Sequence, residues 1–325
     1  MNIKSEPEGD HIYDLYLGAD KPHIIRIALE LDVFSKLEAK PAKVEGVAQA
    51  CGCSITGMSR LLDYLTGLQL LVKKDSDYSL SCDAATFLVR GKKSYTGDLI
   101  MYFSGYTPWE SVRDSIRSGV PQKIDFEIHF AQDAWIESYR SMRIPSSLEM
   151  WAKLGVTPSA ALKLKILDVA SGCGIKSMVL VRGSGNVDLT CLDSPLVLEV
   201  ARDLAARMAI SSRVRFSADN LLTADLGEWE FDYCLLGQIT HYLTQGQNID
   251  LFSRIQKALR PGGTLVLDVP MATEQLDETS SFLSLILWAN SGGGAYSFSE
   301  YKSFLAIAGF TNANQLSERL LSARK

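Results

Sequence analysis

Lys163-Leu-Lys-Ile-Leu-Asp168-Val-Ala-Ser-Gly172-Cys-Gly174 is the stretch of sequence that decides the fold. Its first half is short and mostly apolar, as expected of a strand buried in a parallel sheet. The small residues that follow predict a tight turn, because glycine accepts positive φ and lets a ligand approach the backbone. Residues 175–181 are predicted to form a helix, whose first N–H groups would face that ligand. This order is typical of nucleotide-binding α/β sheets.

A second strand is predicted over residues 187–192, with Asp193 and Ser194 directly after it. Asp193 lies 193 − 168 = 25 positions after Asp168. A carboxylate at that distance is placed to accept hydrogen bonds from both hydroxyls of a ribose. The sequence therefore predicts a nucleoside-containing ligand above these two strands.

The glycine turn is also a degraded form of the dinucleotide-binding pattern G-x-G-x-x-G, with Ser177 in place of the third glycine. Asp168 is expected at the mouth of the loop, where its negative charge would repel a pyrophosphate. The same charge suits a ligand that carries an ammonium or a sulfonium group. A nicotinamide-dependent enzyme remains an alternative.

Length and composition limit the choice of class. The 325 residues leave room for two domains, and the hydrophobic and charged fractions of 46% and 22% are those of a globular protein. A net charge of −5 argues against binding to bulk nucleic acid or to an anionic membrane surface. No apolar run approaches the ~20 residues of a membrane span, and the start lacks a signal-peptide core. A cytoplasmic location is therefore expected.

The six cysteines are scattered, which fits a reducing compartment. The one close pair, Cys51-Gly-Cys53, has neither a histidine nearby nor a second pair, so no metal site is expected.

The first hundred residues predict a winged helix-turn-helix. Apolar spacing indicates helices over residues 23–37 and 43–51 and a third helix capped by Ser54, followed by a β-hairpin over residues 70–80. A DNA-binding regulator with a ligand-sensing second domain is thus a second alternative.

The third helix of this unit would have to read base edges in such a regulator. It offers Arg60 and Gln69 for that purpose, among threonine, aspartate and serine. DNA binding is therefore the less favoured interpretation of the winged helix.

Several stretches resemble one family in order and spacing. Asp168, Ala170, Gly172 and Gly174 form D-x-A-x-G-x-G, which resembles motif I of the class I S-adenosylmethionine (SAM) dependent methyltransferases, with Ala170 where a glycine is usual. Residues 29–34, 59–71 and 85–98 resemble the dimerisation domain of the O-methyltransferases, of the plant caffeic-acid and the bacterial polyketide-tailoring types. The resemblance continues through residues 259–267 and 299–310 and covers nearly the whole chain from Ile24.

The resemblance implies a homodimer in which a mainly α winged-helix dimerisation domain precedes an α/β, Rossmann-like methyltransferase domain. We expect three parts: residues 1–100 for dimerisation, a helical linker over 101–155 that contributes to the substrate pocket, and a SAM-binding catalytic domain over 156–325. The cofactor is expected to be S-adenosyl-L-methionine, with S-adenosyl-L-homocysteine as product. No nucleic acid, membrane or metal is expected.

The expected cofactor ligands lie at the ends of the predicted strands. An aspartate after the strand at 213–216 is placed to accept a hydrogen bond from the adenine amine, with a leucine packed on the ring. The full set is Asp168, Ala170, Gly172, Gly174, Asp193, Ser194, Asp219, Asn220, Leu221 and Gly237.

His241 follows the strand predicted at 231–236 and matches the position of the general base in the O-methyltransferases. A phenol titrates near ~10, so a base is needed at neutral pH as the methyl group arrives. The family usually has an acid directly after this histidine, where this chain has Tyr242. Asp268, at the place of the family's usual glutamate, is expected to hold the His241 ring or to end its strand.

The linker over 101–155 is rich in aromatic residues. Most of them are expected in core, and some are expected to line a pocket for a flat apolar substrate. The chosen set is Trp135, Tyr139, Met142 and Trp288, of which Met142 matches the family's pocket methionine.

The expected activity is methyl transfer to a hydroxyl of an aromatic or polyketide-like small molecule. Because the chain departs from the family at Ala170, Tyr242 and Asp268, a second enzyme interpretation is kept. In it the protein binds SAM but methylates carbon or nitrogen, or uses the sulfonium as a fixed positive charge in another reaction.

Overall fold

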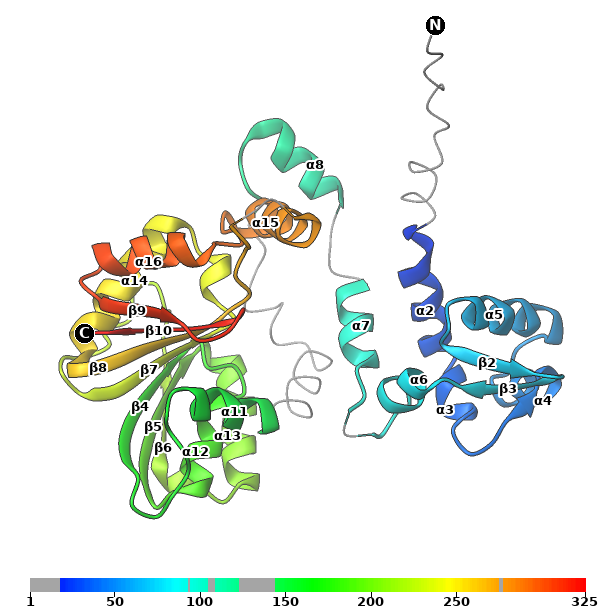
Figure 1. Cartoon of the computed structure of the whole chain (residues 1–325), viewed down its shortest axis with the longest axis horizontal. Helices are drawn as coiled ribbons and strands as arrows, with labels where there is room; N and C mark the ends of the chain where they lie inside the picture. Colours follow the sequence, from blue (N-terminus) through cyan, green and yellow to red (C-terminus); the bar gives the residue numbers. More distant parts are fainter. Residues whose placement is uncertain (1–17, 93, 105–108, 123–143, 275–276) are drawn as a thin grey trace, which may run out of the picture. The chain divides into compact units, whose positions relative to one another are not determined.

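The computed structural model describes residues 18–92, 94–104, 109–122, 144–274 and 277–325 (Figure 1). The chain divides into two compact units, residues 1–106 and 107–325. The sequence-based boundaries after residues 100 and 155 remain predictions. None of the helices in the described ranges is long and apolar enough to cross a bilayer.

The first unit contains the predicted helices and hairpin. Its elements are α2 (Asp20–Glu30), α3 (Val33–Lys36), β1 (Ala42–Lys43), α4 (Val44–Ala50), α5 (Ile55–Gly67), β2 (Leu71–Lys74), β3 (Asp77–Leu80), α6 (Cys82–Phe87) and α7 (Gly97–Ser104). The strands form an antiparallel sheet in the order β1-β3-β2. Ser54 caps α5 as predicted, because its hydroxyl accepts a hydrogen bond from Gly57 N at 3.1 Å.

The helix predicted over residues 23–37 is instead two helices. Asp32 adopts a left-handed conformation with φ 57° between α2 and α3. A single left-handed residue ends a helix, and aspartate tolerates this conformation better than most residues. Apolar periodicity continues across the break, since Leu29 and Phe34 both enter the core of this unit. The sequence pattern therefore did not show it.

The second unit is a doubly wound α/β sheet. Its elements are α8 (Trp109–Ser118), α11 (Ile144–Lys153), β4 (Lys163–Val169), α12 (Ile175–Gly183), β5 (Asn186–Asp193), α13 (Pro195–Arg207), η1 (Ser211–Arg213), β6 (Val214–Ala218), β7 (Phe231–Gly237), η2 (Thr240–Tyr242), α14 (Gln245–Ala258), β8 (Leu259–Asp268), α15 (Glu278–Ser291), α16 (Phe298–Ile307), β9 (Thr311–Gln315) and β10 (Leu320–Arg324). The strand order is β6-β5-β4-β7-β8-β10-β9. Strands β4 to β8 are parallel, and β10 and β9 are antiparallel additions at one edge. The predicted Rossmann-like fold is confirmed.

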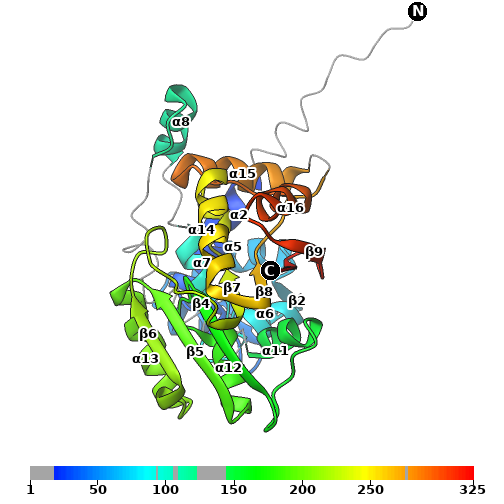
Figure 2. The ribbon, with the colours of Figure 1, turned by 90° about the vertical axis from the view of Figure 1, so that its left-hand side faces the viewer.

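Helices cover both faces of this sheet (Figures 1 and 2). Side chains of α11, α12 and α13 form one core with one face, and those of α14 and α16 form another with the opposite face. On β4, Ile166 enters the first core and Leu167 the second. The second half of β4 is buried on both faces, so apolar residues follow one another there instead of alternating with polar ones.

The sheet changes direction at β4. After β4 the chain winds outward to β5 and β6, and it then returns to place β7 on the other side of β4. In open α/β sheets, ligands bind in the crevice above the carboxyl ends of the strands at such a switch point. A ligand-binding site is therefore expected at the carboxyl ends of β4, β5, β7 and β8.

Candidate active site

The glycine loop after β4 contains three left-handed residues within five positions. Ala170, Gly172 and Gly174 have φ values of 53°, 58° and 73°. Gly174 directly precedes α12, and a Cβ added there would lie 2.7 Å from Met178 Cε. The positive φ therefore favours glycine at position 174, and a side chain there would also have to displace the end of Met178. Alanine at position 170 has no such freedom, and a left-handed L-residue costs about 1–2 kcal/mol.

Asp193 at the end of β5 holds this loop in place. One carboxylate oxygen accepts a hydrogen bond from Gly172 N at 2.8 Å, and the other accepts one from Ser194 N at 2.8 Å. Burial raises the pKa of Asp193, while these two N–H donors oppose the rise. A carboxylate oxygen has lone pairs for more than one donor, so both oxygens keep capacity for ligand hydroxyls.

The loop after β6 lies next to Asp193. The backbone N–H of Asp219 donates to the carbonyl of Asp193 at 3.2 Å, and the side chains of Asp219 and Asn220 accept from the N–H groups of Asn220 and Leu222. Leu221 packs partly buried against the core of the sheet. Asp193 at the end of β5 and Asp219 after β6 thus lie beside the glycine loop. The apolar side chain of Leu221 lies close to Asp219 in the chain. This combination suits a ribose and a purine base.

Arg254 on α14 supports that loop from below, and sequence reasoning missed it. Its guanidinium donates to the carbonyl of Leu221 at 2.9 Å and to that of Ala224 at 3.0 Å. Its spacing from Asp250 on the same helix, with which it forms an ion pair, suggested nothing more than a surface pair.

Asp168 does not lie at the mouth of the loop as the sequence analysis expects. It is 2% exposed, beneath the loop, where it accepts a hydrogen bond from the Ser177 hydroxyl at 2.6 Å. Burial raises its pKa to about 7, and the Ser177 hydrogen bond and the nearby Lys176 charge only partly offset this rise. The last residues of β4 are covered by α12 on one face, and this burial overrides the position suggested by the loop pattern.

Lys176 crosses the carboxyl edge of the sheet from the first turn of α12. A Cβ added to Gly237, the last residue of β7, would lie 2.8 Å from its Nζ. The ammonium group ends 2.5 Å from the Asp268 carboxylate at the end of β8, and the two side chains are 7% and 18% exposed. The Lys176 side chain therefore lies directly against the backbone of Gly237. A lysine inside an otherwise apolar predicted helix was the signal for this residue.

His241 lies on the short helix η2 that follows β7 and is 5% exposed. Its Nδ1 has no hydrogen-bond partner among the residues that the structure describes. Burial, together with the positive charges of Arg319 and Lys176, lowers its pKa to about 3. The neutral imidazole is therefore the form present at neutral pH.

The expected contact between Asp268 and His241 is not formed. No hydrogen bond or ion pair joins the two side chains, because the Asp268 carboxylate is directed to Lys176 instead. Asp268 is one methylene shorter than glutamate, and an ammonium group lies within its reach. A full charge attracts the carboxylate more strongly than a neutral imidazole does.

The backbone around His241 is held by buried polar contacts. The hydroxyls of Thr240 and Tyr301 are 2.8 Å apart, and the Asn248 side-chain amide donates to the Thr240 carbonyl at 2.9 Å. The carbonyl of His241 accepts from Gly294 N at 2.9 Å. The Tyr242 ring lies against the imidazole, with 4.3 Å between ring centroids. The histidine is thus fixed through its main chain rather than through its ring nitrogens.

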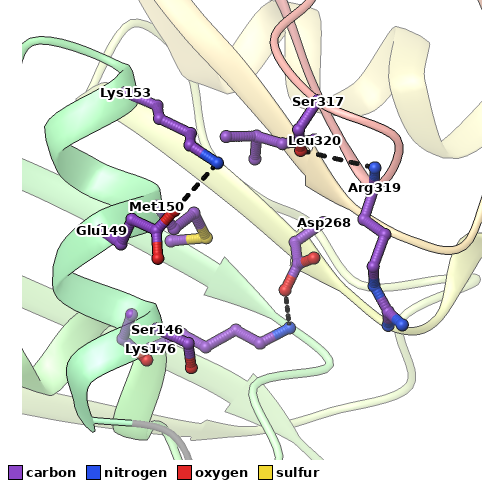
Figure 3. A pocket seen from close by; sticks show the side chains of 10 residues that line it. Ser146, Glu149, Met150, Lys153, Lys176, Asp268, Ser317, Arg319 and Leu320 are labelled. Atoms are coloured by element: carbon purple, nitrogen blue, oxygen red, sulfur yellow. Dashed lines mark hydrogen bonds and ion pairs between the residues drawn. The ribbon is translucent and has the colours of Figure 1, made fainter.

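A cavity of about 210 Å³ opens beside Lys176 and Asp268 (Figure 3). It lies between α11, the end of β8 and the turn that joins β9 to β10. Its lining residues are Ser146, Ser147, Glu149, Met150, Lys153, Lys176, Asp268, Ser317, Arg319 and Leu320. Sequence reasoning missed Arg319 because the β9–β10 hairpin was not predicted.

Three of the predicted substrate residues, Trp135, Tyr139 and Met142, lie outside the described residues. The fourth, Trp288 on α15, is partly buried and packs against Val112, Ile286 and Ala289. The pocket that these four residues were expected to form therefore stays a prediction.

A doubly wound sheet with this glycine loop and two acidic strand ends defines a class of protein, the Rossmann-like enzymes that bind a nucleoside cofactor. Comparison with known families then identifies the family within this class. One family model, described as the O-methyltransferase dimerisation domain, matches residues 13–90, and another, described as the O-methyltransferase domain, matches residues 109–311. The chain therefore belongs to the O-methyltransferase family, and it is a SAM-dependent methyltransferase.

Individual relatives agree with this assignment. Acetylserotonin O-methyltransferase of Rattus norvegicus is 27% identical over 88% of this chain and 69% of its own length. The 3-hydroxy-5-methyl-1-naphthoate 3-O-methyltransferase of Streptomyces sahachiroi is 25% identical over 91% and 88%. Among solved structures, human N-acetylserotonin methyltransferase in complex with SAM superposes with a TM-score of 0.79, at 20% identity and over 100% and 99% of the two chains. An O-methyltransferase family protein from Burkholderia thailandensis gives 0.81, at 18% identity and 99% coverage of both chains.

We expect the substitution Asp193→Ala to weaken binding of S-adenosylhomocysteine about ten- to a hundredfold. The change removes both the proposed acceptor for the ribose hydroxyls and the brace on Gly172, and hydrogen bonds to a charged group contribute about 1.5–3 kcal/mol. Calorimetric titration measures the effect. Asp188→Ala, at the exposed opposite end of β5, is the matched control and should leave affinity unchanged. Equal affinities for the two variants would contradict the assignment.

The buried Asp168 predicts a specific pH dependence of stability. Its folded-state pKa is about 7 against an ordinary value of 3.8, so the folded protein holds a proton that the unfolded chain has already lost. The free energy of unfolding should therefore fall as the pH rises from about 4 to about 7, by up to about 4 kcal/mol, and then level off.

The substitution Asp168→Asn should remove this contribution and flatten the pH profile. Urea unfolding at several pH values between 4 and 8 tests the prediction, with the exposed Asp188→Asn as control. Parallel profiles for wild type and Asp168→Asn would show that Asp168 is ionised in the folded protein.

Proposed function

We propose that the protein transfers the methyl group of SAM to a hydroxyl of an aromatic or polyketide-like small molecule. The observation that carries the proposal is the position of His241, a buried neutral imidazole just after β7 on the same edge of the sheet as the glycine loop. The names of the relatives support the acceptor class, because they include enzymes that methylate hydroxyls of acetylserotonin and of a naphthoate.

The cofactor residues predicted from the sequence fit this proposal with one change. Asp193 would accept the ribose hydroxyls, Asp219, Asn220 and Leu221 would face the adenine, and Gly172 would border the rest of the cofactor through its backbone. The bound cofactor supplies an electrophilic methyl group on a sulfonium. Asp168, since it is buried, would act by shaping the loop through Ser177 rather than by touching the sulfonium directly.

His241 is the proposed general base. A phenolic hydroxyl must lose its proton while its oxygen attacks the methyl, and an imidazole that is already neutral is free to accept that proton. Much of the remaining acceleration would come from holding oxygen, methyl and sulfur in line. Asp268 keeps a place in the proposal as the partner of Lys176, which sets the charge around His241.

A second candidate is chemistry other than hydroxyl methylation on the same fold, such as C- or N-methylation or a SAM-binding reaction without methyl transfer. The unpartnered Nδ1 of His241 and the absence of a contact from Asp268 favour this candidate. Mass spectrometry of products formed from labelled SAM separates the two, because a label on carbon or nitrogen, or no label at all, excludes the first.

The substitution His241→Ala should lower kcat for hydroxyl methylation by ~10²–10⁴-fold, the usual contribution of a general base. Affinity for S-adenosylhomocysteine should stay within about twofold, because His241 is not among the proposed cofactor ligands. His23→Ala, which removes an exposed imidazole from α2, is the control. Full turnover in His241→Ala would exclude the base role.

We also propose that the protein forms a homodimer through its first unit. That unit carries the match to the dimerisation domain, and among its described residues five large apolar side chains are exposed and not part of its own core. They are Ile27, Ile55, Tyr64, Val72 and Phe87, which are 41–53% exposed.

Light scattering should give twice the mass of one chain for the full-length protein. Deletion of residues 1–95 should give a folded monomer, because the second unit has hydrophobic cores of its own on both faces of its sheet. Circular dichroism confirms folding of the deletion variant. A dimer that survives the deletion would place the interface in the second unit.

A further inference from the structure

The cavity beside Asp268 has more positive than negative side chains. Its two acids are both paired: Glu149 lies 3.0 Å from Lys153, and Asp268 lies 2.5 Å from Lys176. The remaining charge on the wall is Arg319, whose guanidinium forms no ion pair or side-chain hydrogen bond with any residue that the structure describes. One unit of positive charge is therefore left over in the cavity.

The main chain of Arg319 is firmly placed although its side chain is exposed. Its carbonyl accepts a hydrogen bond from Val269 N at 2.8 Å, which ties the β9–β10 turn to the residue after Asp268. Leu316 N donates to the carbonyl of Leu320 across the turn at 2.8 Å. Arg319 and Lys176 line the cavity from different elements, the β9–β10 turn and α12 (Figure 3). A cation thus lies at the carboxyl edge, and no acidic side chain in the described part of the chain forms an ion pair with it.

This charge lies close to the proposed base. Arg319 and Lys176 are the two cations whose fields reach the buried His241 imidazole. Lys176 lines the cavity, and its Nζ lies against Gly237, four residues before His241. A ligand group in the cavity would therefore lie at the sheet edge that carries the proposed base. The cavity volume of about 210 Å³ is large enough for a carboxylate together with the aromatic ring that carries it.

We propose that the acceptor is an aromatic hydroxy acid, whose carboxylate binds Arg319 in this cavity while its hydroxyl faces His241. The inference rests on the proposed function and deepens it by naming the charge of the substrate. Arginine is suited to the task because its planar guanidinium binds a carboxylate through two parallel hydrogen bonds. The bound anion would also counter the two positive charges that disfavour a proton on His241, so the substrate itself would improve the base.

A second carboxylate source has the same chemistry, namely the amino-acid part of the cofactor. The test therefore measures both ligands. The variants are Arg319→Gln, which removes the charge but keeps a polar chain, and Arg319→Lys, which keeps the charge without the two-pronged geometry. Arg324→Gln is the matched control, because Arg324 is exposed at the end of β10 farthest from Arg319, where it pairs with Thr264 of β8.

The first measurement is calorimetric binding of hydroxybenzoic and hydroxynaphthoic acids, and of the carboxamide of each, to protein saturated with S-adenosylhomocysteine. Wild type and Arg324→Gln should bind at least one acid about ten- to a hundredfold more tightly than its amide. Arg319→Gln should lose this preference, and Arg319→Lys should keep part of it. Affinity of all variants for S-adenosylhomocysteine alone should agree within about twofold.

Three results would overturn the inference. The first is that wild type binds no acid, or binds every acid no more tightly than its amide. The second is that Arg319→Gln keeps the preference for the acid. The third is that Arg319→Gln loses affinity for S-adenosylhomocysteine while its preference for the acid is unchanged. The last result would assign Arg319 to the cofactor carboxylate. A methylation assay on the same panel judges the proposed function separately. Acids that bind through Arg319 but gain no methyl on oxygen would contradict hydroxyl methylation and leave the carboxylate site in place.

Discussion

The buried ion pair between Lys176 and Asp268 is the interaction on which the rest of the site depends. It joins the first turn of α12 to the end of β8 across the carboxyl edge of the sheet, and the Lys176 side chain lies directly against the backbone of Gly237. Both groups are largely removed from water, so neither charge is tolerable alone. Loss of one partner of such a pair typically costs about 3–5 kcal/mol. The pair therefore fixes the geometry of this edge.

This arrangement sets the electrostatics around His241. Since Asp268 pairs with Lys176, it is not available to the imidazole, and the two charged side chains that lower the pKa of the ring, Arg319 and Lys176, are both positive. These charges favour a neutral histidine and an anionic ligand. The base strength of His241 and the charge of the substrate are linked here, because an anion beside Arg319 and Lys176 would stabilise the imidazolium. A histidine oriented by its own carboxylate would not need this help.

The glycine loop illustrates how one alanine is accommodated. Ala170 adopts the left-handed conformation that glycine would take without strain, and the loop stays in place because Asp193 binds Gly172 N from the next strand. Beneath it, Asp168 is held by Ser177 and carries a pKa of about 7. The strain of position 170 is thus offset by hydrogen bonds from groups distant in sequence. The conformation of the loop therefore depends both on its own small residues and on the side chains of Asp193 and Ser177.

The sequence by itself determined the doubly wound sheet, the winged helix and hairpin, and the strand-end positions of Asp193, Asp219 and His241, because apolar periodicity and turn residues are local signals. Tertiary structure alone decided the break at Asp32, the burial of Asp168, the pairing of Asp268 with Lys176 and the place of Arg319. These depend on which elements approach one another and on which charges then share a region of low dielectric. Such choices follow from contacts between residues far apart in the chain, and a linear pattern does not encode them.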